Sequence, residues 1–138
     1  MLPRGTLSRS ALLLVKLGNE VMAQAEDPLA AIGLSGRQYI VLAVLSEDAP
    51  PSQQELAGLC GLLPAQIVPV IDELERRGLV ARQRSEADRR RSVVTLTPAG
   101  TKALKAADAL GDRLVAGLDE DTRRAAIDAL SRSYNTAD

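Results

Sequence analysis

The stretch from Leu74 to Leu96 constrains the fold of this chain more than any other. It starts as the end of a helix, breaks at Gly78, and continues as two alternating segments on either side of an arginine-rich turn. Residues 76–91 are strongly positive, although the chain as a whole has a formal net charge of −1. The acidic residues of this segment are Glu86 and Asp88, and its arginines are Arg76, Arg77, Arg82, Arg84, Arg89, Arg90 and Arg91. A projecting hairpin with this charge suits a phosphate backbone, although a solvated hairpin whose charges protect an edge strand explains the run about equally well.

Composition narrows the class of protein. A length of 138 residues predicts a single domain over residues 1–138. Only 1% of the residues are aromatic, so we expect an aliphatic core and disfavour RNA modules that stack bases on aromatic side chains. The chain has no histidine, one cysteine and no glycine-rich phosphate loop, so we expect no enzyme activity, no metal and no cofactor. No apolar run is long enough for a membrane span, and we expect a cytoplasmic protein.

The hydrophobic pattern before the hairpin predicts four helices. The first covers residues 6–26 and is apolar on more than one side, which a core helix or a subunit interface would explain; Asp27-Pro28 is expected to end it. Ser35 is a suitable N-cap for a second helix, residues 36–46. Ser52 and Glu55 form a capping box for a third, Gly61 breaks it, and Pro64 begins a fourth.

Two further helices are predicted after the hairpin. Thr97-Pro98 supplies an N-cap and a first-turn proline for a helix that runs to about residue 117, and the acidic residues 119–121 begin a last one. The expected order is α-α-α-α-β-β-α-α, a mainly helical chain with a small β-hairpin. Two short helices joined by a tight turn predict a helix-turn-helix, and the hairpin after it makes this a winged helix.

Three segments resemble the MarR family of bacterial transcriptional regulators. They read Ser-Gln-Gln-Glu-Leu-Ala at 52–57, Leu-Glu-Arg-Arg-Gly-Leu-Val at 74–80, and Asp-Arg-Arg-Arg-Ser-Val-Val-Thr-Leu-Thr-Pro-Ala-Gly at 88–100. The resemblance implies a winged helix-turn-helix at 35–100, flanked by dimerisation helices at 6–30 and 101–138. It also implies a homodimer, most often a repressor, that binds a pseudo-palindromic double-stranded DNA and is released by a small aromatic or phenolic effector.

The resemblance assigns roles to individual residues. The recognition helix is expected at 64–77 and the wing at 82–96. Arg90 enters the minor groove and Asp88 braces it. Contacts to phosphate, or support for them, are expected from Ser52, Gln53, Arg84, Arg89 and Arg91.

The recognition helix departs from the family pattern. Gln66 is the one side chain at 63–70 able to hydrogen-bond a base edge, most naturally adenine, while Ala65 and Val68 offer apolar contact to a thymine methyl. Pro69 predicts a bent or irregular helix, and therefore thin base readout. A dimeric ligand-binding or protein-interaction module that has lost sequence-specific DNA binding stays open as the alternative.

An effector cavity is predicted between the first two helices. Leu17, Met22 and Tyr39 are candidates to line it, although a core tyrosine is at least as good an interpretation of Tyr39. Arg37 is suited to bind a carboxylate effector or a phosphate. Cys60 has no partner cysteine or histidine, which favours a small core residue over a redox sensor.

Overall fold

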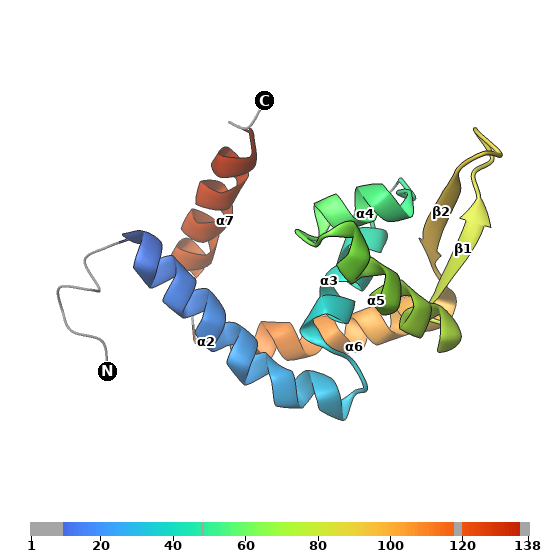
Figure 1. Ribbon diagram of the computed structural model, residues 1–138. Helices are drawn as coiled ribbons and strands as arrows, with labels where there is room; N and C mark the ends of the chain where they lie inside the picture. The colour runs from blue at the N-terminus through green and yellow to red at the C-terminus, as the bar shows by residue number, and fades with distance from the viewer. Residues whose placement is uncertain (1–9, 48, 118–119, 136–138) are drawn as a thin grey trace.

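The computed structural model of the chain describes residues 10–47, 49–117 and 120–135, and it is mostly helical with one antiparallel hairpin (Figure 1). The predicted order is confirmed: α2 (Ser10–Ala31), α3 (Gly36–Leu45), α4 (Gln53–Leu59), α5 (Pro64–Arg76), β1 (Val80–Arg84), β2 (Ser92–Leu96), α6 (Pro98–Leu114) and α7 (Glu120–Asn135).

An aliphatic core holds α3, α4, α5 and the hairpin together, as the composition predicts. One buried stripe of α5 consists of Ile67, Ile71 and Leu74, each at most 1% exposed. The other fully buried side chains of this cluster come from the neighbouring elements: Val41 and Leu42 of α3, Leu56 of α4, Val80 of β1 and Val94 of β2. Burying such a side chain contributes about 1.5–3 kcal/mol, so this cluster is what joins the hairpin to the helices.

Side-chain caps begin three of the helices at the predicted residues. Ser35 Oγ accepts from the Gln38 N–H at 3.2 Å, and Thr97 Oγ1 accepts from the Gly100 N–H at 3.0 Å. Ser52 forms the predicted capping box: its Oγ accepts from the Glu55 N–H, and its own N–H donates to Glu55 Oε2 at 2.9 Å. Each cap stabilises its helix by about 0.5–2 kcal/mol.

The turn between α4 and α5 is set by Gly61. Its φ of 66° lies in the left-handed region that side chains disfavour. The Gly61 N–H donates to the Gly58 carbonyl and the Leu62 N–H donates to the Ala57 carbonyl, which is the pairing of a Schellman motif. The chain therefore ends α4 abruptly at Leu59 and begins α5 at Pro64, three residues after Gly61.

The first helix extends beyond Asp27-Pro28, so the prediction that this dipeptide ends it was wrong. α2 continues to Ala31, and Leu29 in its last turn is only 3% exposed. Proline removes one N–H donor from the helical ladder, whereas continuing the helix by one turn places Leu29 in the core. The Leu29 carbonyl then accepts from the Leu34 N–H at 2.9 Å and closes the helix.

Pro69 does not interrupt the recognition helix. α5 is one continuous helix from Pro64 to Arg76, although Pro69 lacks the N–H that would donate to the Ala65 carbonyl. Pro69 and Ala65, whose carbonyl loses its helical donor, are both on the exposed face, where water can satisfy the group. Burial of the opposite face holds the helix in shape.

The hairpin pairs with the start of the helix-turn-helix as well as with itself. Val80 faces Leu96 and Arg84 faces Ser92 across the antiparallel pair. A further bridge joins Ser52 to Val93, and the Val94 N–H donates to the buried Pro51 carbonyl at 3.0 Å. The residues just before α4 therefore hold the wing against this helix.

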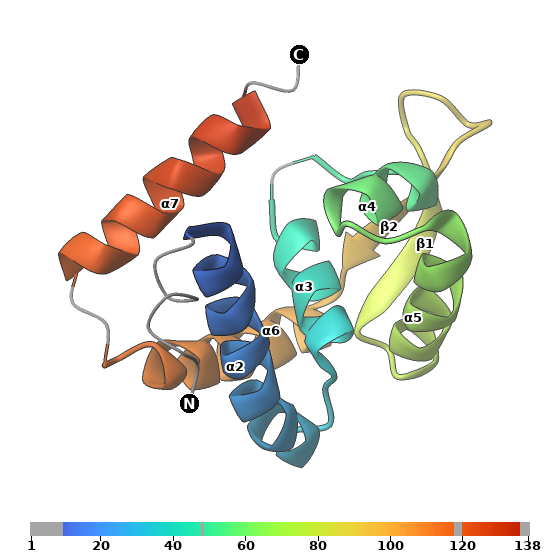
Figure 2. The same ribbon diagram turned by 60° about the vertical axis from the view of Figure 1, so that its left-hand side comes forward.

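The outer helices differ in how they relate to this unit. α6 packs along α2, α3 and β2, so the boundary expected near residue 100 falls inside a helix that serves both parts. α7 stands away from α3, α4 and α5 in both views (Figures 1 and 2). Among the described residues no single helix is long and apolar enough to span a membrane. Two pairs of consecutive helices meet the criteria of length and hydrophobicity only when each pair is counted as one segment, and these pairs are bent by 84° and 108°.

Candidate nucleic-acid interface

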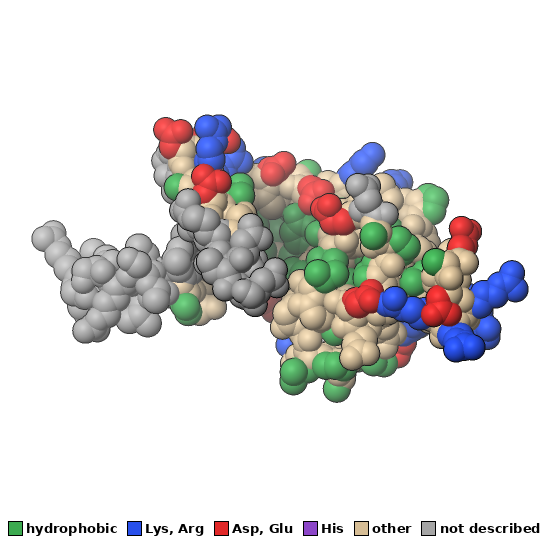
Figure 3. Space-filling model, turned by 90° about the horizontal axis from the view of Figure 1, so that it is seen from above, with side chains coloured by type: hydrophobic (Ala, Val, Ile, Leu, Met, Phe, Trp, Pro, Cys, Tyr) green, Lys and Arg blue, Asp and Glu red, His purple; other side chains and the backbone are tan. Residues whose placement is uncertain are grey.

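The wing tip carries three arginines whose charges are not paired with a carboxylate in the described part of the chain. Arg84, Arg89 and Arg90 are exposed, and they form no ion pair within the described part of the structure. Arg84 and Arg89 line one shallow hollow with Ser85 and Glu86. Lys and Arg side chains gather at the wing end of the molecule (Figure 3). Three of the predicted DNA contacts thus lie together where a phosphate backbone can reach them.

Asp88 shapes the turn that presents these arginines. Its Oδ1 accepts from the backbone N–H of Arg90 at 3.0 Å, and its carbonyl accepts from the Arg91 N–H at 2.9 Å. Ser85 Oγ accepts from the Asp88 N–H at 3.3 Å. Asp88 therefore braces Arg90 through the backbone, and the Arg90 side chain extends from a turn that is already closed.

Arg91 has a different environment from its neighbours. Its guanidinium pairs with the carboxylate of Glu55, the residue that completes the Ser52 capping box. The Ser52 N–H, and after it the Arg91 side chain, hold the pKa of Glu55 below its usual range. Arg91 thereby ties β2 to the first turn of α4, and a phosphate contact from Arg91 would compete with this pair.

Arg82 is a structural link between the wing and the recognition helix. Its guanidinium donates to Asp72 and Glu75 of α5, and its backbone N–H donates to Glu75 Oε1 at 3.1 Å. These hydrogen bonds raise the pKa of Arg82 although burial by itself lowers it. The Arg82 N–H bond, followed by the guanidinium bond, lowers the pKa of Glu75. The only sign of this link in the sequence is that Asp72 and Glu75 share one helix face.

The side chains of Gln53 and Ser52, at the start of α4, each form one hydrogen bond within the chain. Gln53 Oε1 accepts from Arg82 Nε at 3.2 Å, and Ser52 Oγ accepts from the Glu55 N–H. Both residues line a hollow between the start of α4 and β2. These two hydrogen bonds use the oxygens of both side chains as acceptors and leave the Gln53 amide N–H groups and the Ser52 hydroxyl proton out of them.

Gln66, the predicted reader of adenine, already uses part of its amide within the chain. Its Oε1 accepts from the Leu63 N–H at 2.9 Å, which caps the start of α5. An adenine pair needs both an acceptor and a donor from the same amide. Ala65 and Val68 are exposed on the outward face of α5, as the sequence predicts.

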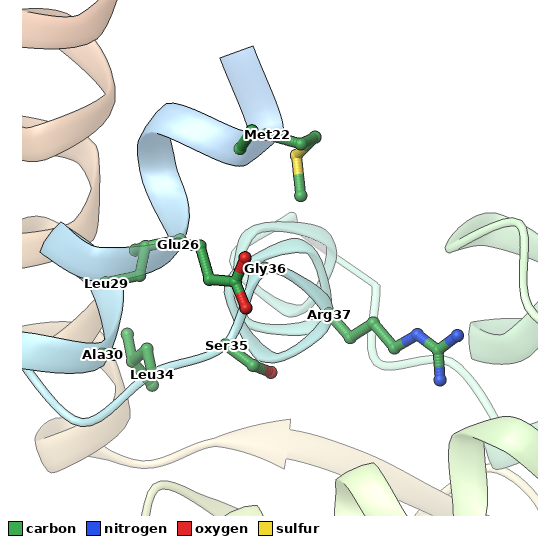
Figure 4. A pocket seen from close by; sticks show the side chains of 9 residues that line it. Met22, Glu26, Leu29, Ala30, Leu34, Ser35, Gly36 and Arg37 are labelled. Carbon is green, nitrogen blue, oxygen red and sulfur yellow. The ribbon is translucent and has the colours of Figure 1, made fainter. Parts of the chain in front are cut away.

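A cavity of about 440 Å³ lies between α2 and α3, where an effector site is predicted. Met22 and Arg37 line it, together with Glu26, Leu29 and Leu34. In Figure 4 the Glu26 carboxylate is directed toward the start of α3 at Ser35 and Gly36, and Arg37 extends away from it. The side chain of Leu17 lies outside the described residues.

Tyr39 does not line this cavity, and its interpretation as a structural residue is the one that fits. Its hydroxyl donates to Asp108 Oδ1 of α6 at 2.8 Å. Burial, followed by this hydrogen bond and the charge of Asp108, raises the pKa of Tyr39 to about 12. The bond joins α3 to α6. Cys60 is likewise half-buried, and burial raises the pKa of its thiol, as expected of a packing residue.

No group of three or more His, Cys, Asp or Glu residues able to hold a metal occurs in the part of the chain that the structure describes. The arrangement of a capped helix-turn-helix, a bonded hairpin and exposed arginines at its tip defines a winged helix-turn-helix regulator.

Comparison with known proteins identifies the family. Residues 32–91 match the model described as MarR family. A transcriptional regulator of Bacillus subtilis, YcgE, is 31% identical over 103 residues, which cover 74% of this chain and 67% of YcgE. CouR of Rhodococcus jostii bound to p-coumaroyl-CoA is 31% identical, with a TM-score of 0.82 over 96% of each chain. CouR bound to a 23-mer DNA duplex has a TM-score of 0.79 over 97% of this chain and 99% of that one. The chain belongs to the MarR family of transcriptional regulators.

Proposed function

We propose that this regulator is a homodimeric repressor that binds a pseudo-palindromic operator through α5 and the wing and acts in the cytoplasm, where bacterial DNA lies. The observation that carries the proposal is the exposed set Arg84, Arg89 and Arg90 on a turn closed by Asp88. Its relative CouR has been solved on a DNA duplex, which supports the same use of the fold here. We propose no catalytic role, in keeping with the family.

Binding to DNA upstream of the gene, compared with a scrambled duplex across a salt series, tests this function. Specific binding that weakens steeply with salt is expected, because each phosphate contact that releases a counterion adds about 0.9 to the slope of log affinity against log salt. Arg90→Ala is expected to reduce affinity for every duplex. Arg76→Ala is the control, since it removes the same charge from a side chain paired with Glu73. Equal affinity for both duplexes at all salt concentrations would contradict the proposal.

The dimer is proposed to form through α2, α6 and α7, with residues 1–138 acting as one unit. Val15 of α2 is 60% exposed and Ile127 of α7 is 63% exposed in the single chain. α7 projects from the rest of the molecule, so a second copy has access to this apolar surface (Figure 2). A two-fold dimer would space its two recognition helices about 34–36 Å apart, one turn of DNA.

We propose that the cavity between α2 and α3 takes an aromatic acid or its acyl thioester, and that this ligand weakens DNA binding. CouR has been solved with p-coumaroyl-CoA, which supports the ligand class. A volume of about 440 Å³ suits an aromatic acyl group, and its apolar residues Met22, Leu29 and Leu34 suit a ring. Arg37 is placed at the edge to pair with an anionic group.

Titration of the protein–DNA complex with p-coumarate and p-coumaroyl-CoA tests the ligand class. Release of DNA by either compound is expected, and Arg37→Ala is expected to raise the concentration needed while leaving DNA affinity in its absence unchanged. If neither compound changes DNA affinity or binds the free protein, the proposed ligand class is wrong.

An interaction module is the second candidate, because Leu59 and Leu63 beside the recognition helix are 65% and 67% exposed. Such apolar exposure is common at protein contacts. The salt series distinguishes the two: absence of any preferred duplex, including in a random pool, would favour this module.

A further inference from the structure

The outward face of α5 carries almost no hydrogen-bonding groups in the half that meets a base edge. The exposed residues of this half include Ala65, Val68 and Pro69, none of which has a polar side chain. They lie on the side of the helix opposite the buried Ile67 and Ile71. Helix-turn-helix proteins contact bases with the first turns of this helix. Asp72, the next polar side chain along the face, is held by Arg82.

Gln66 is the one polar side chain in these first turns, and its orientation is determined by its cap. The Leu63 backbone supplies an N–H, so the group 2.9 Å from it must be the amide oxygen of Gln66. The amide nitrogen is then the end that remains to meet DNA. Gln66 then directs its two N–H donors outward, while its oxygen already accepts one hydrogen bond from the backbone.

Resting on the proposed DNA-binding function, we propose that α5 reads thymine: the Gln66 amide donates to thymine O4, while Ala65 and Val68 contact the thymine methyl. In the major groove the only apolar group on a base is this methyl, and O4 beside it is an acceptor. Cytosine places an N–H₂ donor where O4 would be, so it would face the Gln66 donor. Adenine also presents a donor, and guanine accepts but has no methyl.

The test starts from duplexes selected by the wild-type protein from a random pool. A base pair whose selection changes in the Gln66 and Val68 variants identifies the position read by α5. Four duplexes are then compared that differ only at that base pair, in which thymine or uracil pairs with adenine and 5-methylcytosine or cytosine pairs with guanine. Uracil lacks only the methyl, and 5-methylcytosine keeps the methyl but replaces the acceptor by a donor.

The expected order of affinity is thymine, then uracil and 5-methylcytosine, then cytosine. Loss of the methyl contact is expected to weaken binding about fourfold for one buried methyl-sized group. Replacing O4 by a donor is expected to weaken it roughly tenfold, the effect of one lost hydrogen bond.

Gln66→Glu isolates the donor, because a carboxylate oxygen can keep the Leu63 cap while the N–H groups are removed. It is expected to reverse the preference between 5-methylcytosine and thymine. Gln54→Glu adds the same charge at an exposed position of α4 and is expected to leave that ratio unchanged. Val68→Ala is expected to reduce the thymine-to-uracil ratio toward one. Ratios between duplexes cancel any general loss of affinity from the added charge.

The outcomes separate this inference from the function on which it rests. Selected duplexes with equal affinity for thymine and uracil, or a preference for adenine that depends on Gln66, would overturn thymine readout and leave the DNA-binding regulator intact. Failure to select any duplex would overturn both.

Discussion

At the scale of residues, one hydrogen bond and one close backbone contact determine the geometry of the junction between the wing and α6. The Leu-Thr-Pro-Ala-Gly sequence at 96–100, which ends the third segment that resembles the family, has a physical cause here: Thr97 Oγ1 donates to the Gly78 carbonyl at 2.6 Å, and α6 passes close to the Leu79 carbonyl. A Cβ at Gly100 would lie 2.0 Å from the Leu79 oxygen, a distance that no backbone relaxation of small size can relieve. The glycine is needed for space.

Gly100→Ala is expected to destabilise the protein by about 3 kcal/mol or more, because the clash involves backbone and forces α6 from the core. Gly58→Ala is the matched control: a Cβ at this position of α4 would have nothing within 4 Å of it, and alanine is a better helix former by about 1 kcal/mol. Chemical denaturation of both variants measures the difference. Equal free energies of unfolding would show that the junction can adjust.

Tyr39 predicts a loss of stability at high pH. Its folded pKa of about 12 lies above the ordinary value of 10.0, so between these values the unfolded chain has released a proton that the folded protein keeps. Stability is therefore full below about pH 10 and falls as the pH rises toward 12. Tyr39→Phe is expected to remove this part of the pH dependence. Phenolate absorbance of Tyr134→Phe, in which Tyr39 is the one remaining tyrosine, reports the pKa itself.

At the scale of elements, the wing is bonded to both helices of the motif. Arg82 joins β1 to α5, Arg91 joins β2 to α4, and the Pro51 carbonyl extends the hairpin at its base. In the sequence, Arg82 and Arg91 cannot be distinguished from the arginines at the wing tip, because all of them carry the same charge. The ion pairs divide them into cations that hold the wing and cations that face outward.

Arg82→Ala is expected to lower the free energy of unfolding by roughly 1.5–3 kcal/mol, since it removes charged hydrogen bonds and leaves Asp72 and Glu75 facing each other. DNA affinity is expected to fall as well, because the wing loses its register on α5. Arg84→Ala, two residues further along the strand, is expected to weaken DNA binding with little change in stability. Denaturation and DNA titration of both variants separate the roles; a stable Arg82→Ala protein with normal DNA affinity would contradict them.

At the scale of the whole molecule, the outer helices carry apolar side chains that remain exposed in the single chain. α7 stands apart from the helix-turn-helix, and the exposed side chains of Val15 and Ile127 lie on the two terminal helices. A second copy would bury this surface and fix the distance between recognition helices. Ligand binding between α2 and α3 would then change DNA affinity only through its preference for one dimer geometry.

Ile127→Glu is expected to convert the dimer to monomer at micromolar concentration and to weaken operator binding by orders of magnitude, because a charge would be buried in the interface. Ala125→Glu places the same charge at an exposed position on the opposite face of α7, about 160° around the helix from Ile127, and is expected to leave the dimer intact. Analytical ultracentrifugation reports the mass. A dimeric Ile127→Glu protein would place the interface elsewhere.

The sequence by itself determined the features that depend on neighbouring residues. Ser35, Ser52 and Thr97 cap the predicted helices, Gly78 follows the predicted end of α5, and the hairpin occurs where alternation predicts it. Capping and turn conformations are local, so the residues that cause them lie within a few positions of their effect.

Only the tertiary structure decided which polar groups are already occupied. Arg82 meets Gln53 from 29 positions away and Arg91 meets Glu55 from 36, while Tyr39 bonds Asp108 on a helix far along the chain. Burial of Leu29 outweighed the break expected at Pro28. Gln66 shows that a local cap can also be missed when its partner is a backbone N–H. Composition supplies the donors and charges, but packing decides which of them remain for DNA, because each buried or bonded group is no longer offered to a ligand.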